Sequence, residues 1–588
     1  MVVFEMNKSM DVLLINVPIA FNMNENLEPP LGVTYMGAML RKHGHSPLIK
    51  DYEVEEFDPD VFKKYIAEKS PSFVGISSRT ASYSSAKYLT ELVKEVNDGI
   101  YVVLGGHHVT VYDRQSIDET RADIVVRGEG EIAVLDILEV LKGEKDISSV
   151  DGITYRKSSY PAKTNGNADS NGADNVRNKD RTEYNDLDSL PFPAWDLLPL
   201  HRYTVSNVIT SRGCPYSCTY CDKAISTRKI RYRSPELVIK EIQELRAVAK
   251  APIIYFCDDV FFLNKKRVSE MFDKMEEANL DIDWVCQSRT SPMDHSLLPR
   301  AAALGCKMII FGIESGDETE LRFINKQQSL QEVRDTCNAT HNAGIRVRAN
   351  FMLGFPITTK ETMKNTIRFA ASIPLDICRF FIVVPFPNTG IWDYIFEHDL
   401  AKDPRFIDHN GERTFDWDQF DLYRPSYEIP GVTHSDLLNY SGAAFLYVLQ
   451  RSIAKEVFLH GIPNFVKFAK LYMKNRKIRG NVSQSFPQLG NLVGELYHLT
   501  KGKSVIQRIA YAFRIIMLDF VITFFHRAPK TETYSIKNQN HPDIEEKTST
   551  RVAFPTVTFN QQPNNWKGKQ VQAKIDKLDL VDSLKLPY

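Results

Sequence analysis

The chain has 588 residues, which is too long for one hydrophobic core and predicts at least two domains. Hydrophobic residues make up 43% and charged residues 25%, a balance typical of globular proteins and unlike disordered or membrane-spanning chains. The formal net charge of -1 gives no electrostatic case for binding nucleic acid. The N-terminal stretch MVVFEMNKSMDVLLINVP lacks the basic leader of a signal peptide, so we expect a cytoplasmic, reducing location.

The first part of the chain alternates strand-like and helix-like stretches. Such alternation predicts a parallel sheet covered on both faces by helices, and we assign it to a domain at 1–150. The expected strands are 11–17, 73–78, 101–106 and 123–128, and the expected helices are 32–44 and 85–96.

The segment 151–200 differs in composition. Between 157 and 186 it is rich in Ser, Asn, Asp, Gly and Lys, which predicts a flexible insertion. The following LDSLPFPAWDLLP combines prolines with large apolar residues and indicates an ordered connector.

A second strand–helix alternation occupies 201–395. Six repeated units predict a partial or complete parallel β/α barrel, so the fold class is α/β throughout these two domains. One helix is expected from Pro235 with Ser234 as its N-cap. The expected strands are 205–211, 253–257, 282–287, 307–313, 346–353 and 378–384. Beyond them we expect a helical region at 396–530 and a loosely ordered tail at 531–588.

Three of the eight cysteines fall within the motif SRGCPYSCTYCDK: Cys214, Cys218 and Cys221. Three thiolates at C-x3-C-x2-C spacing, on a loop that leaves a strand, can converge on one metal centre. Three local ligands would leave one iron of a [4Fe–4S] cluster open. A zinc site completed by His201 or Cys257 is the alternative that spacing alone leaves open. The other five cysteines lie in apolar segments and are expected to be buried structural thiols.

The motif resembles the CxxxCxxC signature of the radical S-adenosylmethionine (SAM) superfamily, including the aromatic Tyr220. The segments FCDDVFF, FGIESGDETEL, NFMLGFPITTKET and VVPFPNTG resemble, in order, the strand ends that surround SAM in that family. The resemblance implies that the open iron binds SAM and that one electron cleaves it to a 5′-deoxyadenosyl radical. The residues expected to contact SAM are Tyr220, Asp258, Asp259, Arg289, Glu314 and Gly354, with Arg289 pairing with the SAM carboxylate. The alternative is that these residues have ordinary structural roles, in helix caps, turns and surface ion pairs.

The first domain resembles the Rossmann-like cobalamin-binding domain that precedes the radical SAM barrel in one large subgroup. The matching segments are EPPLGVTYMGAMLRKHGH, GISSRTASY, LGGHHVT and VRGEGE. Ligands of open parallel sheets bind at the carboxyl ends of the strands, where glycine turns allow close approach. The resemblance assigns cobalamin contacts to Gly75, Ser77, Thr80, Gly105, Gly106, His108, Gly128 and Glu129. No D-x-H-x-x-G motif is present, so histidine ligation of cobalt is not expected; a domain without its cofactor is the alternative.

This architecture implies a cobalamin-dependent methyltransferase that acts on an unactivated carbon of a small-molecule or lipid-like substrate. Oxidative cyclisation, as in the anaerobic magnesium-protoporphyrin ester cyclase, is a second possibility, and a non-catalytic iron–sulfur or zinc scaffold is a third. The expected electron donor is a flavodoxin or ferredoxin. The apolar stretch 506–525 contains Arg508, Arg514 and Asp519, so we expect a buried helix there, with a peripheral membrane contact as the alternative.

Overall fold

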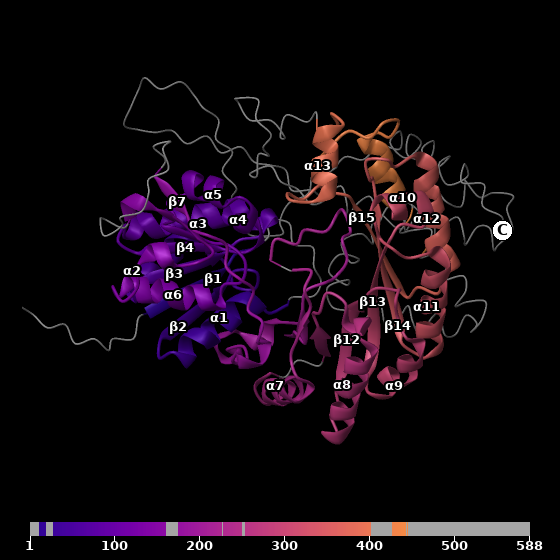
Figure 1. Ribbon diagram of the computed structural model, residues 1–588, viewed down its shortest axis with the longest axis horizontal. Coiled ribbons are helices and arrows are strands. Elements are labelled where there is room, and N and C mark those ends of the chain that lie inside the picture. The colour runs from indigo at the N-terminus through magenta and orange to yellow at the C-terminus, as the bar shows by residue number, and fades with distance from the viewer. Residues whose placement is uncertain are drawn as a thin grey trace, which may run out of the picture.

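The computed structural model describes residues 11–18, 28–159, 174–225, 227–249, 253–401 and 426–442, together with Ala444 and Val448. This part of the chain contains two large, mostly parallel sheets that lie next to each other (Figure 1). The predicted α/β class, with a Rossmann-like first domain followed by an open β/α barrel, is confirmed. The predicted helical region and tail lie mostly outside the described residues, as does the stretch 506–525.

The first sheet has seven strands in the order β2-β1-β3-β4-β5-β6-β7. Strands β1 to β5 are parallel, whereas β6 and β7 each run antiparallel to the neighbour before them. The strands are Asp11–Asn16 (β1), Ser46–Asp51 (β2), Phe73–Ser77 (β3), Tyr101–Gly105 (β4), Ile124–Val126 (β5), Ile153–Arg156 (β6) and Asn175–Arg177 (β7). The helices are Leu31–Lys42 (α1), Pro59–Lys69 (α2), Tyr83–Val96 (α3), His107–Val111 (α4), Asp113–Glu119 (α5) and Glu131–Leu141 (α6).

Two features of this sheet differ from the sequence analysis. The edge strand β2 and the helix α2 were not expected; SPLIKD has only two adjacent aliphatic residues, Leu48 and Ile49, and contains a proline, which weakens a strand signal. Helix α2 does carry a start signal, since the Asp58 side chain accepts a hydrogen bond from the Val61 amide and Pro59 occupies the first turn. Strands β6 and β7 lie in the segment that we interpreted as an insertion and connector, so the first sheet continues past residue 150.

The second sheet has six parallel strands in the order β15-β14-β13-β12-β11-β8, and every one was expected from the sequence. They are Ser206–Val208 (β8), Ile253–Phe256 (β11), Asp283–Ser288 (β12), Cys306–Glu314 (β13), Arg346–Leu353 (β14) and Ile377–Ile382 (β15). The helices are Pro235–Val248 (α7), Lys265–Glu277 (α8), Leu298–Ala303 (α9), Glu318–Phe323 (α10), Leu330–Asn342 (α11), Lys360–Ser372 (α12) and Gly390–Glu397 (α13). Ser234 holds the N-cap position of α7, but its side chain makes no capping bond.

Side chains of the second sheet alternate between two different environments. On β14, Val347, Ala349 and Phe351 are fully buried in the core that α8, α9, α11 and α12 help to form (Figure 1). The alternate residues 346, 348, 350 and 352 occupy the other face, which we call the inner face. Asn207 on the inner face of β8 donates hydrogen bonds to Glu28 and to the Pro29 carbonyl, so this face is turned toward the first domain.

The two domains share buried contacts as well. Tyr203, just before β8 in the second domain, donates a hydrogen bond of 2.7 Å to Asp51 at the end of β2. Leu187 and Leu190 pack in a small cluster with Tyr35 and Met39 of α1, which shows that the connector is ordered on the surface of the first domain. In the described residues, no helix has the length and apolar character needed to cross a membrane.

Candidate active site

The cysteine motif lies on a loop that a short hairpin closes. Strand β9 (Ser211–Arg212) pairs antiparallel with β10 (Arg231–Tyr232). The loop of residues 213–230 therefore begins and ends at this short two-stranded sheet. Gly213 at the start of the loop has a φ of 101°, and a side chain there would strike the Lys229 carbonyl oxygen. The loop is stabilised by bonds from the Cys214 amide to the Thr227 carbonyl and from Lys223 Nζ to the Cys214 carbonyl.

The three thiols of this loop lie near one another at the surface. Local desolvation, opposed by Lys223 and reinforced by the neighbouring Cys218, Cys214 and Asp259, raises the pKa of Cys221 to about 11. That thiol is therefore protonated at neutral pH until a cation displaces the proton, as iron does on binding. In the described residues no three His, Cys, Asp or Glu side chains form a group with the geometry of a metal centre. Three cysteines on one loop, Cys221 exposed and Cys214 and Cys218 partly buried, fit the donor set of a [4Fe–4S] cluster with one open iron.

Tyr220, Glu314 and Lys326 form a buried polar triad beside the cysteine loop. Lys326 Nζ lies 2.9 Å from Glu314 Oε1 and 2.9 Å from the Tyr220 hydroxyl, which donates a bond of 3.0 Å to the same carboxylate oxygen. Glu314 and Lys326 are 8% and 4% exposed, and Glu314 has a left-handed backbone with a φ of 70°. A non-glycine residue in this conformation, at the end of a strand, is typical of functional sites. Sequence analysis anticipated Tyr220 and Glu314 but missed Lys326.

Asp258 follows β11 and is almost completely buried. Its carboxylate accepts four hydrogen bonds, from the amides and hydroxyls of Thr210 and Ser211, at 2.5–3.2 Å. These two residues immediately precede the cysteine loop, so Asp258 holds the start of that loop in place. Burial nevertheless raises the pKa of Asp258 above its ordinary value, against the effect of the hydrogen bonds and of Arg267. A direct contact of Asp258 or its exposed neighbour Asp259 with SAM stays a prediction.

Arg289, expected to bind the SAM carboxylate, is already engaged by the protein. Its guanidinium donates to the backbone carbonyls of Ser291, Lys326 and Gln327. It also lies 3.6 Å from the Cys218 sulfur and stacks on Tyr216, with its central carbon 3.8 Å from the ring centroid. In this structure Arg289 therefore supports the cysteine loop and the segment of Lys326.

Gly354, at the end of β14, also has a local partner. Its carbonyl accepts a hydrogen bond from the buried Tyr427 hydroxyl, and Leu437 and Ile429 lie 3.0–3.5 Å from the position of a side chain. The segment 426–442 thus covers this strand end. No local sequence pattern predicts this contact.

The glycine turns expected to bind cobalamin lie at the carboxyl ends of β3, β4 and β5, at one edge of the first sheet. A side chain at Gly105 or Gly128 would meet no atom within 4 Å, so these positions are open to a ligand. Gly106 is different, because it has a φ of 111° and a side chain there would strike the backbone of Ser78. Gly75 lies inside β3, where a side chain would approach Leu14 to 2.9 Å. Ser77 ends β3, and Thr80 follows as a buried residue.

His108 is a core residue in this structure. It is 1% exposed, and its ring lies 4.0 Å from that of Tyr83, centroid to centroid. Burial lowers the pKa of His108 to about 3, so the ring is neutral at physiological pH. It packs behind the turn that was expected to contact the cofactor.

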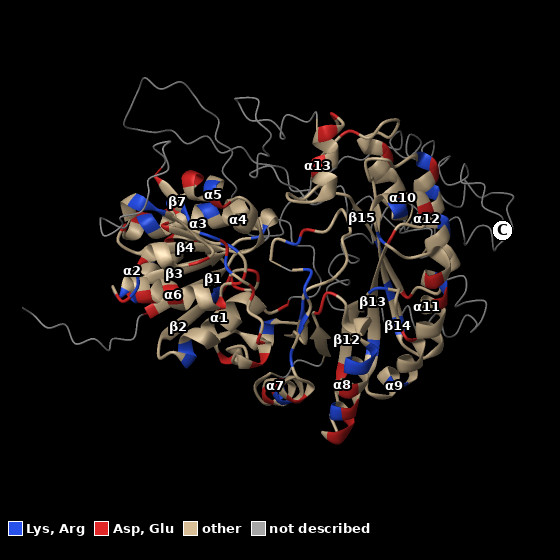
Figure 2. Ribbon diagram, in the orientation of Figure 1, with Lys and Arg blue, Asp and Glu red and all other residues tan. Residues whose placement is uncertain are grey.

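Glu129, in the turn after β5, connects the first domain to the cysteine loop. Its carboxylate pairs with Arg212 at 3.0 Å and with Arg231 at 2.8 Å, the two arginines at the base of the loop. Arg212 also pairs with Glu131 at 2.6 Å. Burial acts to raise the pKa of Glu129, but Arg231 and Arg212 outweigh it and lower the pKa. Figure 2 shows acidic and basic residues where the two domains meet.

We call Glu129, Glu131, Arg212 and Arg231 the inter-domain bridge.

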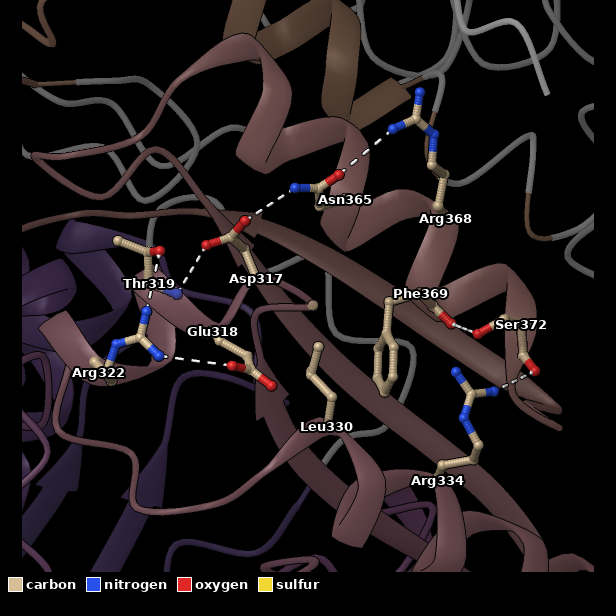
Figure 3. A pocket seen from close by; sticks show the side chains of 11 residues that line it. Asp317, Glu318, Thr319, Arg322, Leu330, Arg334, Asn365, Arg368, Phe369 and Ser372 are labelled. Atoms are coloured by element: carbon tan, nitrogen blue, oxygen red, sulfur yellow. Dashed lines mark hydrogen bonds and ion pairs between the residues drawn. The ribbon is translucent and has the colours of Figure 1, made fainter.

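A surface pocket of about 620 Å³ lies elsewhere, on the outer helices α10, α11 and α12 (Figure 3). Leu330 and Phe369 lie at its centre, while Arg334 donates to the Ser372 carbonyl and Arg322 pairs with Glu318. No residue of the cysteine loop or of the glycine turns lines it. It is therefore separate from both predicted cofactor sites.

The chain has a first parallel sheet that ends in glycine turns, followed by an open β/α barrel that carries the cysteine loop. Comparisons with known families agree with this division into two domains. Residues 208–370 match the radical SAM superfamily, and residues 23–138 match the B12 binding domain. The chain therefore carries a B12-binding domain followed by a radical SAM domain. These two domains fit the [4Fe–4S] cluster, SAM and cobalamin expected from the sequence, and they support an enzyme over the non-catalytic scaffold.

Three similar proteins illustrate the range of this family. The chain is 29% identical to an uncharacterized methyltransferase of Pyrococcus horikoshii, over 74% of this chain and 90% of that protein. It is 24% identical to the anaerobic magnesium-protoporphyrin IX monomethyl ester cyclase of Rubrivivax gelatinosus, over 70% and 72% of the two chains. The fold is similar to that of TsrM from Kitasatospora setae, a radical SAM methyltransferase solved with cobalamin and a [4Fe–4S] cluster, with a TM-score of 0.59, 16% identity, and coverage of 75% and 91%.

Proposed function

We propose that this enzyme is a cobalamin-dependent radical SAM methyltransferase that transfers a methyl group to an unactivated carbon of a small-molecule or lipid-like substrate. The inter-domain bridge is the observation that carries this proposal furthest. It ties the glycine turn after β5 to the base of the cysteine loop, so the two predicted cofactor sites are held beside each other. The relative from P. horikoshii, described as a methyltransferase, supports the same reaction class.

In this proposal Cys214, Cys218 and Cys221 hold the cluster, and the open turns at Gly105 and Gly128 admit cobalamin. When bound, the reduced cluster cleaves SAM to a 5′-deoxyadenosyl radical, and cobalamin carries the methyl group. The chain's own contribution is positioning: Asp258 and Arg289 fix the cysteine loop from two sides. The electron for the cluster is expected from a flavodoxin or ferredoxin.

The triad beside the loop suits the amino-acid end of SAM. Glu314 and Lys326 neutralise each other while buried, and SAM carries an ammonium and a carboxylate on one carbon. If the ammonium pairs with Glu314 and the carboxylate with Lys326, each buried charge exchanges one partner for another. Neither is left alone, which would be costly. We therefore assign the SAM carboxylate to Lys326 in place of Arg289.

Oxidative ring formation is the second candidate, because the similarity to the R. gelatinosus cyclase extends over 70% of this chain. The two reactions differ in the fate of the SAM methyl group, which reaches the product only in methylation.

The test is to incubate the anaerobically reconstituted enzyme with a reductant, cell metabolite extract and SAM labelled with ¹³C in its methyl group. Methylation predicts a product that carries the label. An unlabelled product that is dehydrogenated or ring-closed, and that forms with 5′-deoxyadenosine, would move the assignment to the cyclase. The Cys218→Ala variant, run in parallel, controls for methyl transfer by other proteins in the extract.

A further inference from the structure

Two arginines stand on the inner face of the second sheet, on neighbouring strands. Arg348 of β14 pairs in register with Ile377 of β15, and Asn350 pairs with Arg379. Because side chains alternate along a strand, Arg348, Asn350 and Arg379 all lie on the face opposite the helical core. None of these residues belongs to the predicted SAM or cobalamin contacts.

The charge of Arg348 acts on residues of the first domain and of β11. Burial raises the pKa of Glu28, in the loop before α1, and also the pKa of Tyr255 on β11, while Arg348 acts to lower both. Arg348, on the inner face by its register with Ile310 and Ile377, is therefore within electrostatic range of both residues. Glu28 also accepts a hydrogen bond of 3.3 Å from Asn207 of β8, which places its carboxylate beside the inner face.

Arg379 is half-buried and lies between apolar neighbours. Among the described residues, no hydrogen bond or ion pair engages its guanidinium. Ile377 and Phe381, two residues before and after it, are 39% and 40% exposed, although both are large and apolar. Asn350 Oδ1 is buried and accepts no hydrogen bond from the described residues. A half-buried cation, an unsatisfied amide oxygen and exposed apolar side chains therefore lie together on one face.

We propose that this face binds the substrate, and that the substrate is amphipathic and carries an anionic group, a carboxylate or phosphate, that pairs with Arg348 and Arg379. Arginine is well suited to these anions because its planar fork donates two parallel hydrogen bonds. Asn350 then accepts a bond from a hydroxyl or amine of the substrate, and Ile377 and Phe381 contact its apolar part. This inference rests on the proposed function and specifies its substrate class.

The test uses dodecyl phosphate as the probe, with dodecyl glucoside as its uncharged counterpart, both below their micelle concentrations. Binding to the anaerobically reconstituted full-length enzyme is measured by titration calorimetry. We expect dodecyl phosphate to bind at least tenfold more tightly than the glucoside. Arg348→Gln and Arg379→Gln should each remove most of that preference, while Arg348→Lys and Arg379→Lys should retain part of it. Arg346→Gln, on the same strand but exposed at its outer end, is the matched control.

Iron content and 5′-deoxyadenosine formation without substrate show that each variant is folded. Competition by inorganic phosphate identifies the source of the anion: displacement of the probe at equal concentration indicates a soluble phosphate compound, whereas weak displacement indicates an amphiphile that also uses its chain. Either result supports the anion site. Equal binding of the charged and uncharged probes, or an unchanged preference in both glutamine variants, would overturn it. Methyl transfer to an uncharged product would refute this inference and leave the proposed function intact.

Discussion

The two sheets of this protein offer ligands two different kinds of edge. The first sheet ends in glycine turns, and at Gly105 and Gly128 the space next to the backbone is empty. The second sheet ends in charged side chains that already pair with one another, as Glu314 does with Lys326. One edge therefore provides backbone and space, while the other provides preformed charge pairs.

This difference matches the sizes and charges of the ligands that the family uses. The corrin ring of cobalamin is large and needs a backbone surface that is free of side chains. A single added side chain can therefore exclude it. SAM is small and zwitterionic, and it needs charges held in place before it arrives, because buried charges are costly to create on demand. We therefore expect steric substitutions to act at the first edge and charge substitutions at the second.

The largest effect is expected from Cys218→Ala, which removes one of three cluster ligands. Iron and sulfide content after anaerobic reconstitution should fall to background, and SAM cleavage should stop. Iron quantification and the visible absorbance of the cluster measure this. Cys337→Ala, a buried thiol on α11 far along the chain, should retain the iron. Stoichiometric zinc without iron in the unaltered protein would contradict the assignment.

At the first edge, Gly105→Trp should prevent cobalamin binding, with an affinity loss of about a hundredfold or more, because the added ring fills the open turn. Iron content should be unchanged. Gly99→Trp, in the turn at the opposite end of β4, is the matched control and should bind cobalamin normally. Gly106 is unsuitable for this test, since any side chain there strains the fold. Normal uptake by Gly105→Trp would show that cobalamin lies elsewhere.

At the second edge, the double variant Glu314→Gln, Lys326→Gln removes both charges and leaves neither buried alone. Charge-assisted hydrogen bonds contribute about 1.5–3 kcal/mol each, so SAM binding should weaken at least tenfold. Equilibrium dialysis with the cluster-loaded protein measures the affinity. Lys364→Gln on the outer helix α12 serves as the control. Unchanged SAM affinity would remove this triad from the binding site.

A smaller effect is expected from His108, which packs against Tyr83 in the core of the first domain. Its folded pKa of about 3 lies below the ordinary value of 6.5, so the unfolded chain takes up a proton first as the pH falls. The contribution of His108 to the free energy of unfolding is therefore fully present above pH 6.5 and is lost progressively toward pH 3. At pH 5 the loss amounts to about 2 kcal/mol.

His108→Phe should remove this part of the pH dependence. Thermal unfolding at pH 7.5 and pH 5 measures it, with His341→Gln, an exposed residue of α11, as the control. An equal loss of stability at pH 5 in His108→Phe and the unaltered protein would mean that His108 is not responsible.

Much of this architecture follows from local sequence. Continuous apolar runs such as those of β1 and β13 are long enough to be recognised as buried parallel strands, and the cysteine spacing identifies its loop. Lys326 could not be found in this way, because its partners Tyr220 and Glu314 are 106 and 12 residues away in sequence. The contact of Gly354 with Leu437 could not be found in this way either, because no signal in the neighbouring sequence predicts it.

The direct test of the central claim is the stoichiometry of products in a single incubation with substrate. Methylation of an unactivated carbon consumes one SAM for the radical and a second to restore the methyl group. The account therefore predicts one 5′-deoxyadenosine and one S-adenosylhomocysteine for each methylated product, above the level formed without substrate. Product that accompanies 5′-deoxyadenosine alone, with no matching S-adenosylhomocysteine, would contradict it.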